Sequence, residues 1–389
     1  MERKKRIGLG LMSGTSMDGI DVVVAGISGQ CTDIRLESIA HATFPYNDQV
    51  AARIRDISSG RSVNVHELAE LDFAVGEAFA EAALRLVESI RLPIERIDFI
   101  ASHGQTVHHH ERSRGETASS MQLGEASVIA ERLGACVVSD FRRADIAAGG
   151  EGAPLVPYAD YVVFADATKT RVIHNIGGIS NITVLPAGGA LEDVGAFDTG
   201  PGNMMIDIAM RTLYREPFDR DGNIAAQGEV DRSMLKTLME DPYFDVAPPK
   251  STGHARFGET AVHRLLEAYP RSAPADVIAT LTQFTVESVV KGYRRFVSAE
   301  TPAKEWILCG GGVKNKTMRS RLEEALADIA FSTVDAYGID SDAKEALAFV
   351  VLGHETLNGV PANVPSATGA KRRVVLGKIT PYVKDGRRA

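Results

Sequence analysis

The chain of 389 residues lacks the features that would suggest an oxidising compartment or a membrane. Its three cysteines, Cys31, Cys136 and Cys309, are isolated, without the CxxC spacing of a zinc or redox site. We therefore expect three unpaired thiols that pack as small hydrophobic side chains in a reducing cytoplasm. No apolar run approaches the roughly 18 residues that a membrane span requires, so no membrane partner is expected.

The chain also lacks an excess of positive charge. Lysine and arginine number 43 against 51 aspartates and glutamates, which gives a formal net charge of −8. Proteins that bind nucleic acids or anionic membranes usually carry a basic surface, so we expect a small-molecule partner and no nucleic acid. The length exceeds that of one ordinary domain and favours two lobes.

The stretch from Gly8 to Val24 organises the rest of the chain. Two apolar runs flank a centre rich in serine and glycine, a pattern that predicts a β-hairpin. Gly14 and Gly19 permit close approach of the backbone to an anion, and the hydroxyl groups between them add donors. An ordinary hairpin turn is the alternative. Asp18 beside a phosphate would need a cation such as Mg²⁺ between them, so the loop favours a metal–nucleotide.

The first half is predicted to alternate between helices and strands. Asn64 and Glu67 form a capping box before apolar residues at helical spacing. The strand Ile97 to Ala101 is expected to present His103 just beyond its carboxyl end, where ligand sites of α/β sheets gather. His108 to His110 on the following loop would point in different directions without further ligands, so no zinc site is expected.

Residues 140–157 are predicted to form a loop with an unusual content. Arg142 and Arg143 lie between Asp140 and Asp145, before a run of glycine and proline. A surface cluster of ion pairs is one interpretation. The other is an arginine fork for a substrate carboxylate, followed by a crossing between lobes.

The second half begins as the first does, which indicates a weak internal repeat. Arg171 to Asn175 and Ile179 to Leu185 are predicted strands around a turn at Gly177 and Gly178. Two such hairpin tips facing each other across a cleft would hold a triphosphate from both sides. The next strand, Val194 to Phe197, would place Asp198 at its carboxyl end.

Two further candidates follow near the end of the chain. A strand from Glu305 to Leu308 leads into Gly310 to Gly312, a turn that would let a purine lie against the backbone but that also has purely structural uses. The last clear helix begins near Ser341 and has Glu345 in its first turn, where the helix dipole favours a carboxylate.

Six motifs together resemble the anhydro-N-acetylmuramic acid kinases and follow the order of that family along nearly the whole chain. They are GLMSGTSMDGID at 10–21, SHGQT at 102–106, DFRR at 140–143, NIGGISN at 175–181, FDTGPGN at 197–203 and CGGG at 309–312. The family belongs to the sugar kinase, Hsp70 and actin superfamily. The resemblance implies an α/β, two-lobed actin-like ATPase fold, each lobe with a ribonuclease-H-like mixed sheet flanked by helices. Glu151 departs from the pattern, since relatives commonly have glutamine there, and it adds negative charge near the anion site.

The resemblance also implies the lobes and the nucleotide site. The N-terminal lobe is expected at residues 1–145 and about 365–389 and the C-terminal lobe at 146–364, with ATP and the sugar in the cleft between them. Asp18 would hold Mg²⁺ directly or through water. The residues expected to bind ATP are Ser13, Gly14, Thr15, Ser16, Met17, Asp18, Gly19, Ile20, Gly177, Gly178, Gly310, Gly311 and Gly312.

The implied acceptor is 1,6-anhydro-N-acetylmuramic acid from recycled peptidoglycan. Arg143 is expected to pair with its lactyl carboxylate, and His103 and Thr106 with hydroxyl or acetamido groups. The family further implies a cytoplasmic homodimer. The alternative function is a non-enzymatic ATP-binding chaperone or sugar sensor of the same superfamily. No segment is spare for a client domain, and no helix-turn-helix is found for a repressor.

The acceptor sets the expected mechanism, because its O6 is tied to C1 and no free 6-hydroxyl exists. The resemblance places the catalytic aspartate at Asp198 and an assisting glutamate at Glu345, which would help to position a water. Asp198 would take a proton from this water as it attacks the anomeric carbon, while O6 leaves C1 and captures the γ-phosphoryl group. The products would be N-acetylmuramic acid 6-phosphate and ADP. The structural alternative is that Asp198 only caps the following helix.

Overall fold

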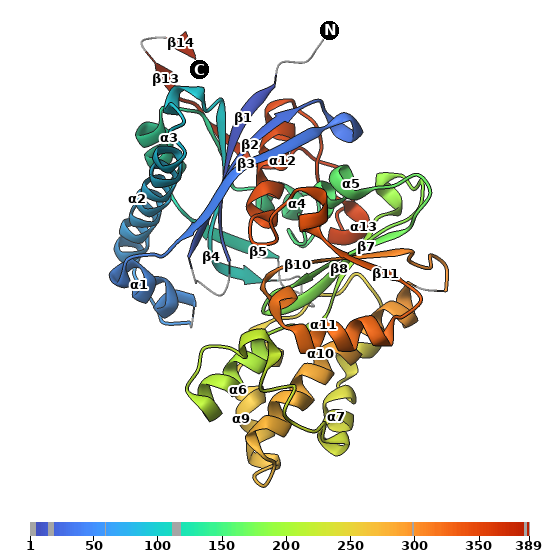
Figure 1. Ribbon diagram of the computed structural model, residues 1–389. Coiled ribbons are helices and arrows are strands. Elements are labelled where there is room, and N and C mark those ends of the chain that lie inside the picture. Colours follow the sequence, from blue (N-terminus) through green and yellow to red (C-terminus); the bar gives the residue numbers. More distant parts are fainter. Residues whose placement is uncertain are drawn as a thin grey trace. The chain divides into compact units, whose positions relative to one another are not determined.

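The computed structural model describes residues 5–14, 19–58, 60–110, 118–297, 299–384 and 387–388. Figure 1 shows an α/β protein. The contacts between its residues divide the chain into two compact units, Met1–Val163 with Gly338–Ala389, and Phe164–Tyr337. These bounds differ from the lobe bounds expected from the sequence, 145 and 365, because helices in the intervening segments pack within the first unit. One of them, α12 (Lys344–Leu357), contacts three strands of that unit.

The first unit is built on a sheet in the order β12-β6-β4-β1-β2-β3, with β5 paired to β4. Its strands are β1 (Arg6–Ser13), β2 (Ile20–Ser28), β3 (Arg35–Phe44), β4 (Phe99–His110), β5 (Ser119–Leu123), β6 (Val137–Ser139) and β12 (Lys378–Thr380). β1 and β2 form the predicted antiparallel hairpin, while β4 runs parallel to β1 and β6 parallel to β4. Residues 15–18 of the hairpin tip lie outside the described part of the chain.

Helices cover both faces of this sheet. Successive residues of β1 point to opposite faces, so the strand contacts helices on each side. Leu9 and Leu11 belong to a core with α2 and α3. On the other face α12 approaches closely, since a Cβ on Gly10 would lie 2.3 Å from the carbonyl oxygen of Ala346. The other helices are α1 (Asp48–Ser58), α2 (Val65–Ser89), α3 (Ala126–Leu133), α4 (Arg142–Ala147), α5 (Pro157–Phe164) and α13 (Pro365–Thr368). The capping box at Asn64 is confirmed.

The second unit has a sheet in the order β11-β10-β7-β8-β9. Its strands are β7 (Arg171–Ile176), β8 (Ile179–Leu185), β9 (Gly195–Pro201), β10 (Glu305–Cys309) and β11 (Ala330–Thr333). Its helices are α6 (Met204–Tyr214), α7 (Arg232–Met239), α8 (His254–Phe257), α9 (Glu259–Ala268), α10 (Pro274–Phe296) and α11 (Lys316–Ala325). A short ribbon, β13 (Val383–Lys384) with β14 (Arg387–Arg388), belongs to neither sheet.

The two sheets share one topology. The first sheet has two extra strands, β5 and β12, which pair antiparallel with β4 and β6. In the five strands that remain in each sheet, the first three pair antiparallel, and the next two continue from the first strand in parallel. The spatial order is therefore 3-2-1-4-5 in both, with only the second strand reversed. This is the ribonuclease-H-like arrangement, so the predicted fold class and the internal repeat are confirmed.

Several local predictions are corrected by strand pairing. β4 continues to His110 because β5 pairs with it, so His103 and the histidines from His108 lie on a strand and not on a loop. The predicted loop after Asp140 contains the helix α4. The last helix begins at Lys344 rather than near Ser341. No disulfide joins the three cysteines, as predicted, but Cys31 is exposed and only Cys309 is fully buried.

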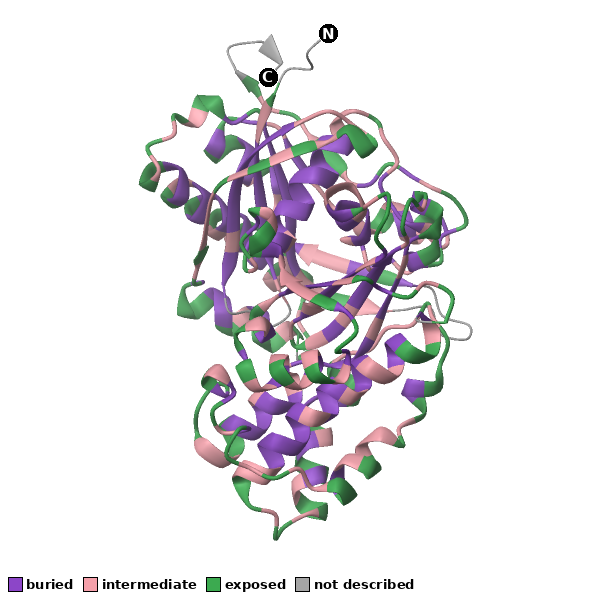
Figure 2. Cartoon of the chain, turned by 45° about the vertical axis from the view of Figure 1, so that its right-hand side comes forward, coloured by how far each residue is buried: buried purple, intermediate pink, exposed green. Residues whose placement is uncertain are grey.

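Burial follows the sheets. Figure 2 shows that the buried residues concentrate on the strands and on the helix faces that cover them. Within the described ranges, no helix combines the length and the apolar character that crossing a membrane would need.

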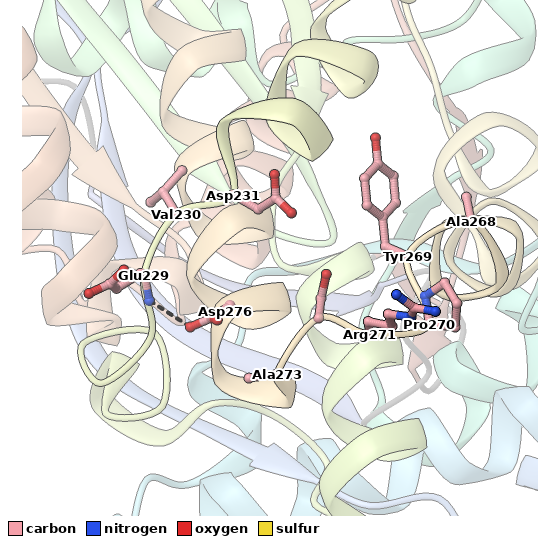
Figure 3. Close-up of a pocket in the computed structure, with 10 residues that line it drawn as sticks. Glu229, Val230, Asp231, Ala268, Tyr269, Pro270, Arg271, Ala273 and Asp276 are labelled. Atoms are coloured by element: carbon pink, nitrogen blue, oxygen red, sulfur yellow. Dashed lines mark hydrogen bonds between the residues drawn. The ribbon is translucent and has the colours of Figure 1, made fainter.

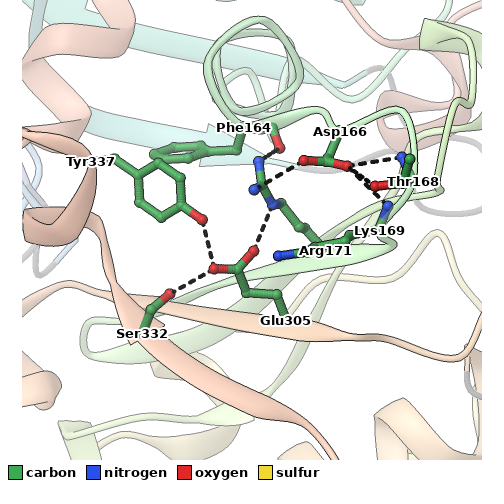
Figure 4. Close-up of polar contacts among 8 residues, drawn as sticks. All are labelled: Phe164, Asp166, Thr168, Lys169, Arg171, Glu305, Ser332 and Tyr337. Carbon is green, nitrogen blue, oxygen red and sulfur yellow. Dashed lines mark hydrogen bonds and ion pairs between the residues drawn. The ribbon is translucent and has the colours of Figure 1, made fainter.

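One guanidinium holds together the two ends of the second unit, where the chain enters at Phe164 and leaves at Tyr337 (Figure 4). Arg171 donates from Nη1 to the Phe164 carbonyl and from Nε to Glu305, both at 2.8 Å, and its Nη2 lies 3.2 Å from Asp166. The Tyr337 hydroxyl donates to the other oxygen of Glu305 at 2.6 Å. Burial opposes ionisation of Glu305, but the bonds from Tyr337 and Arg171 more than offset it and hold its pKa below the usual 4.5.

In the first unit, Asp145 of α4 joins three segments. It is fully buried and accepts hydrogen bonds from Gly152 N at 2.9 Å and from Asn363 Nδ2 and Thr368 Oγ1 at 2.8 Å. A Cβ on Gly150 would lie 2.2 Å from its Oδ2, so the turn at this point requires glycine. Asp145 is therefore not part of a surface ion-pair cluster, which was one interpretation of this region.

We expect Tyr337→Phe to lower the free energy of unfolding by about 1 to 2 kcal/mol at pH 7, because it removes a hydrogen bond to an ionised carboxylate. Since the folded-state pKa of Glu305 is depressed, this contribution is present above pH 4.5 and is lost as the pH falls through the folded value. Urea unfolding of both proteins, from pH 7 down to the lowest pH at which both fold, measures it. A difference that is zero at pH 7, or independent of pH, would contradict this role.

We expect Asp145→Asn to destabilise the protein by about 1 to 3 kcal/mol. Whichever way the new amide turns, its NH₂ group faces a donor, either Gly152 N–H or the groups of Asn363 and Thr368. Calorimetry measures the melting temperature, and Asp328→Asn at an exposed position is the matched control. Equal melting temperatures of the two variants would refute the role of Asp145.

Candidate active site

A glutamine on β4 holds the base of the first hairpin tip. The Ser13 hydroxyl lies 2.8 Å from the Gly19 carbonyl oxygen and 2.7 Å from Gln105 Oε1, and Gln105 Nε2 donates to the Gly14 carbonyl at 3.3 Å. The side chain of Ser13 is thus used to shape the tip. Of the residues expected to bind ATP here, Thr15, Ser16, Met17 and Asp18 lie outside the described residues.

His103 is buried against Phe349, at 4.6 Å between ring centroids, and both of its ring nitrogens are engaged. Arg142 Nε donates to Nε2 at 3.0 Å, which leaves the proton on Nδ1, and this nitrogen donates to the Gly104 carbonyl at 2.9 Å. Burial, assisted by the charge of Arg142, lowers the pKa of His103 well below 6.5. His103 is therefore a neutral group that orients Arg142.

Glu345 lies in the first turn of α12, and its charge shifts the pKa of one basic and one acidic neighbour. Burial lowers the pKa of Arg142 to about 10, and Glu345 partly opposes this shift. The pKa of Asp21 is raised to about 6, mainly by burial and in smaller part by the charge of Glu345, while a hydrogen bond from Thr43 opposes the shift. The carboxylate of Glu345 is thus within electrostatic reach of the His103–Arg142 pair.

The two adjacent arginines of α4 have different surroundings. Arg142 donates from Nη1 to the Gly152 carbonyl at 2.8 Å and is partly buried. Arg143 is half-exposed, and its Nε lies 3.2 Å from Asp140 Oδ1. Arg143 therefore forms the surface ion pair that the sequence suggested. Of the two arginines, Arg142 is the more deeply buried.

A cavity of about 250 Å³ in the first unit is lined by both His103 and Arg143. Ser102, only 1 % exposed, also lines it, and its hydroxyl has no hydrogen-bond partner among the described residues. Gln122 is a further lining residue, and its Nε2 donates to the hydroxyl of Thr106 at 3.2 Å. The residues expected to bind the acceptor are thus on or next to one cavity. Its wall offers hydroxyl and cationic groups together with the carboxylates of Asp72, Glu125 and Asp140.

In the second unit, two of the predicted turns pack on each other through glycine. A Cβ on Gly202 would lie 2.3 Å from the carbonyl oxygen of Gly177. This close approach lets Asn203 N donate to the Gly177 carbonyl at 2.8 Å and Met204 N to the Gly178 carbonyl at 3.1 Å. The turn between β7 and β8 is therefore locked to the start of α6.

The third glycine turn packs against the end of β7. Gly310 has φ 80°, and a Cβ there would lie 2.8 Å from the Ile176 carbonyl oxygen. A Cβ on Gly312 would meet the side chain of Ile176 at 2.2 Å. At Gly311, which is exposed, a Cβ would meet nothing within 4 Å, so the backbone there faces open space.

The sequence placed Asp198 at the carboxyl end of its strand. In the structure Asp198 lies within β9, because the strand continues to pair beyond it. Its carboxylate accepts a hydrogen bond from Thr252 N at 2.9 Å. Its own N–H donates to the Lys250 carbonyl at 3.1 Å, and Tyr243 OH donates to its carbonyl at 2.6 Å. The N-cap of α6 is Asn203, so Asp198 does not cap that helix.

Lys250 places a cation near Asp198. The pKa of Lys250 is lowered to about 8, mainly by burial and also by the charges of Lys291 and Arg295, while Asp245 and Asp198 oppose the shift. The ammonium group also lies over three aromatic rings, those of Tyr243 (4.5 Å), Phe296 (5.0 Å) and Phe197 (5.9 Å).

The residues missed from the sequence are Gln105, Arg142, Tyr243, Lys250 and Thr252. Lys250 and Thr252 lie in a polar stretch that reads only as a loop, and nothing local indicates that it pairs with β9. Arg142 and Arg143 are chemically alike, so only their burial separates them.

A cavity of about 650 Å³ among the helices of the second unit contains none of the predicted residues (Figure 3). Its carboxylates serve local structure: Asp276 accepts from Glu229 N at 2.8 Å, and Asp231 caps α7. We therefore do not assign the active site to it.

Comparisons with known proteins agree with the motifs. The sequence model of the family described as Anhydro-N-acetylmuramic acid kinase matches residues 6–382. The protein of that name from Francisella tularensis subsp. novicida is 44% identical over 95% of this chain and 97% of its own, and that from Caldanaerobacter subterraneus subsp. tengcongensis is 42% identical over 97% and 98%. A solved structure, component A of (R)-2-hydroxyglutaryl-CoA dehydratase from Acidaminococcus fermentans, has a TM-score of 0.46 at 13% identity, covering 89% of this chain and 96% of that one. The chain belongs to the anhydro-N-acetylmuramic acid kinase family.

Proposed function

We propose that the protein uses ATP to open the 1,6-anhydro ring of 1,6-anhydro-N-acetylmuramic acid and to phosphorylate O6. The products are N-acetylmuramic acid 6-phosphate and ADP, in peptidoglycan recycling. Family membership along nearly the whole chain supports the substrate. The observation that carries the chemistry is the placement of Asp198. It lies on β9, the strand that leads into the locked glycine turn, and Thr252 N–H orients its carboxylate.

Asp198 acts as the general base. It accepts one proton from a water whose oxygen forms a bond to C1 while the C1–O6 bond breaks. The electron pair of that bond stays on O6, which attacks the γ-phosphorus, and the bond to the β-phosphate oxygen breaks to release ADP. Phosphoryl transfer thus replaces the acid with which glycosidases protonate a leaving group. Glu345 assists by positioning the attacking water, a role that rests on the family resemblance.

ATP is bound by the hairpin tip from Ser13 to Ile20 and by the glycine turns of the second unit. The open backbone at Gly311 supports this assignment. Mg²⁺ would be held by Asp18 with the phosphates and would neutralise charge on the transferred group.

The acceptor lies beside His103, Thr106 and Arg143, and the direct contacts come from Thr106 and Arg143. Arg143 supplies the positive charge for the lactyl carboxylate, and the cavity that it lines with Ser102 offers hydroxyl groups for a sugar. His103 acts on the sugar through Arg142, since its own ring nitrogens are occupied. The cytoplasmic location and the homodimer are further proposals that rest on the family resemblance.

We expect Asp198→Asn to lower the rate of ADP formation with the anhydro sugar by about 10² to 10⁴, the usual contribution of a general base. The fold should persist, because the amide oxygen can still accept from Thr252 N. Calorimetry and a coupled ADP assay measure both quantities, and Asp231→Asn, outside the proposed site, is the control. Turnover that survives in a folded Asp198→Asn protein would refute the role. So would a reaction in ¹⁸O-water that adds no label at C1 beyond later anomeric exchange.

We expect Arg143→Ala to raise KM for the muramic sugar by about 10-fold or more, because a charge-assisted hydrogen bond is lost. With 1,6-anhydro-N-acetylglucosamine, which has no lactyl carboxylate, the variant and the parent protein should differ little. Steady-state kinetics with both sugars make the comparison. An equal effect on both sugars, or none on either, would exclude a pairing between Arg143 and the carboxylate.

A further inference from the structure

Four buried polar side chains form a continuous hydrogen-bonded chain across the second sheet. Trp306 Nε1 lies 3.2 Å from His174 Nδ1, His174 Nε2 lies 2.8 Å from Ser180 Oγ, and Ser180 Oγ lies 2.7 Å from Thr199 Oγ1. Each of the four residues is at most 1 % exposed. They come from β10, β7, β8 and β9, which are consecutive neighbours in the sheet.

The indole sets the direction of every hydrogen bond in this chain, because it can only donate. His174 Nδ1 must accept, and burial lowers the pKa of His174 to about 3, so the neutral ring has its proton on Nε2. This proton is donated to Ser180 Oγ, whose own proton goes to Thr199 Oγ1. The Thr199 hydroxyl then donates to the Ser180 carbonyl at 3.1 Å.

The chain ends at an irregularity in β9. Ser180 pairs with Gly200 and Asn181 with Asp198, so Thr199 is an extra residue on β9. Such a β-bulge bends its strand and redirects the neighbouring side chains. Thr199 bonds to both the hydroxyl and the carbonyl of Ser180, so its side chain fixes the bulge next to Asp198.

We propose that the chain from Trp306 through His174 and Ser180 to Thr199 positions Asp198 for catalysis. It holds the bulge from inside the sheet, while Thr252 N–H bonds to the carboxylate of Asp198 and Tyr243 OH to its carbonyl. None of the four residues is a catalytic residue, since each acts through Asp198. This inference rests on the proposed function, in which Asp198 is the general base.

Orientation explains the chain better than stability does. Burying four polar groups costs desolvation, and apolar side chains of similar size would fill the same space without that cost. In this hydrogen-bonded chain of side chains, every N–H and O–H proton has a single acceptor. Such a network favours one arrangement of the four strands over others. A displacement of about 1 Å at a reacting group can lower a rate by about 10².

We expect Thr199→Val to lower kcat by about 10- to 100-fold while KM for ATP stays within about twofold, because the base is displaced and the nucleotide turns are intact. Thr199→Ser retains the hydroxyl and should restore kcat. Thr282→Val is the matched control, since this buried threonine in α10 also donates to a backbone carbonyl, at 2.8 Å, but has no link to Asp198. It should lower the melting temperature to a similar extent and leave kcat unchanged.

A second pair of variants tests the middle of the chain and serves if Thr199→Val does not fold. His174→Leu breaks the chain and should lower kcat, whereas His174→Gln retains a nitrogen that can donate to Ser180 and should recover activity. If Thr199→Val and His174→Leu match Thr282→Val in kcat, the chain is only structural and the inference is wrong. If Asp198→Asn itself keeps its turnover, it is the proposed function that fails.

Discussion

The second unit depends on one close approach of two backbones, which only glycine permits. At Gly202 a side chain would lie 2.3 Å from the carbonyl oxygen of Gly177. The first N–H groups of a helix have no partner within the helix, and here the turn before β8 supplies partners for those of Asn203 and Met204. The same contact therefore starts α6 and ends β9. The contact between Gly202 and Gly177 thus fixes the end of the strand on which Asp198 lies.

The first unit has a parallel requirement. Gly10 lets the backbone of α12 approach β1 near Ala346, the residue after Glu345. A larger residue at Gly10 would push away the turn of the helix that carries this carboxylate. The two halves of the chain thus share their strand order and also a device, in which a glycine on or beside a strand sets the place of an acidic side chain.

Much of the fold could be predicted from the sequence, because hydrophobic periodicity and glycine turns are local signals. The hairpins, the helix capped at Asn64 and the repeat of strand, turn and strand are examples. The extent of β4 could not be predicted, since it depends on pairing with β5. For the site, the family resemblance supplied Asp198, which lies in one of the six motifs, and Glu345, which lies in none of them. The motifs could not supply Lys250 and Thr252, whose contacts with β9 are made across a long separation in sequence.

The contact between the rings of Phe164 and Tyr337, 5.3 Å between centroids, means that the ends of the second unit meet. This unit is one continuous segment inserted into the first, whose chain resumes at Gly338. During synthesis on the ribosome, every residue of the inserted unit is made before α12, the helix that covers one face of the first sheet. Domains usually fold in the order in which they emerge. Here the amino-terminal strands must wait for a carboxyl-terminal helix, so the inserted unit can complete its core before the unit that surrounds it in the sequence.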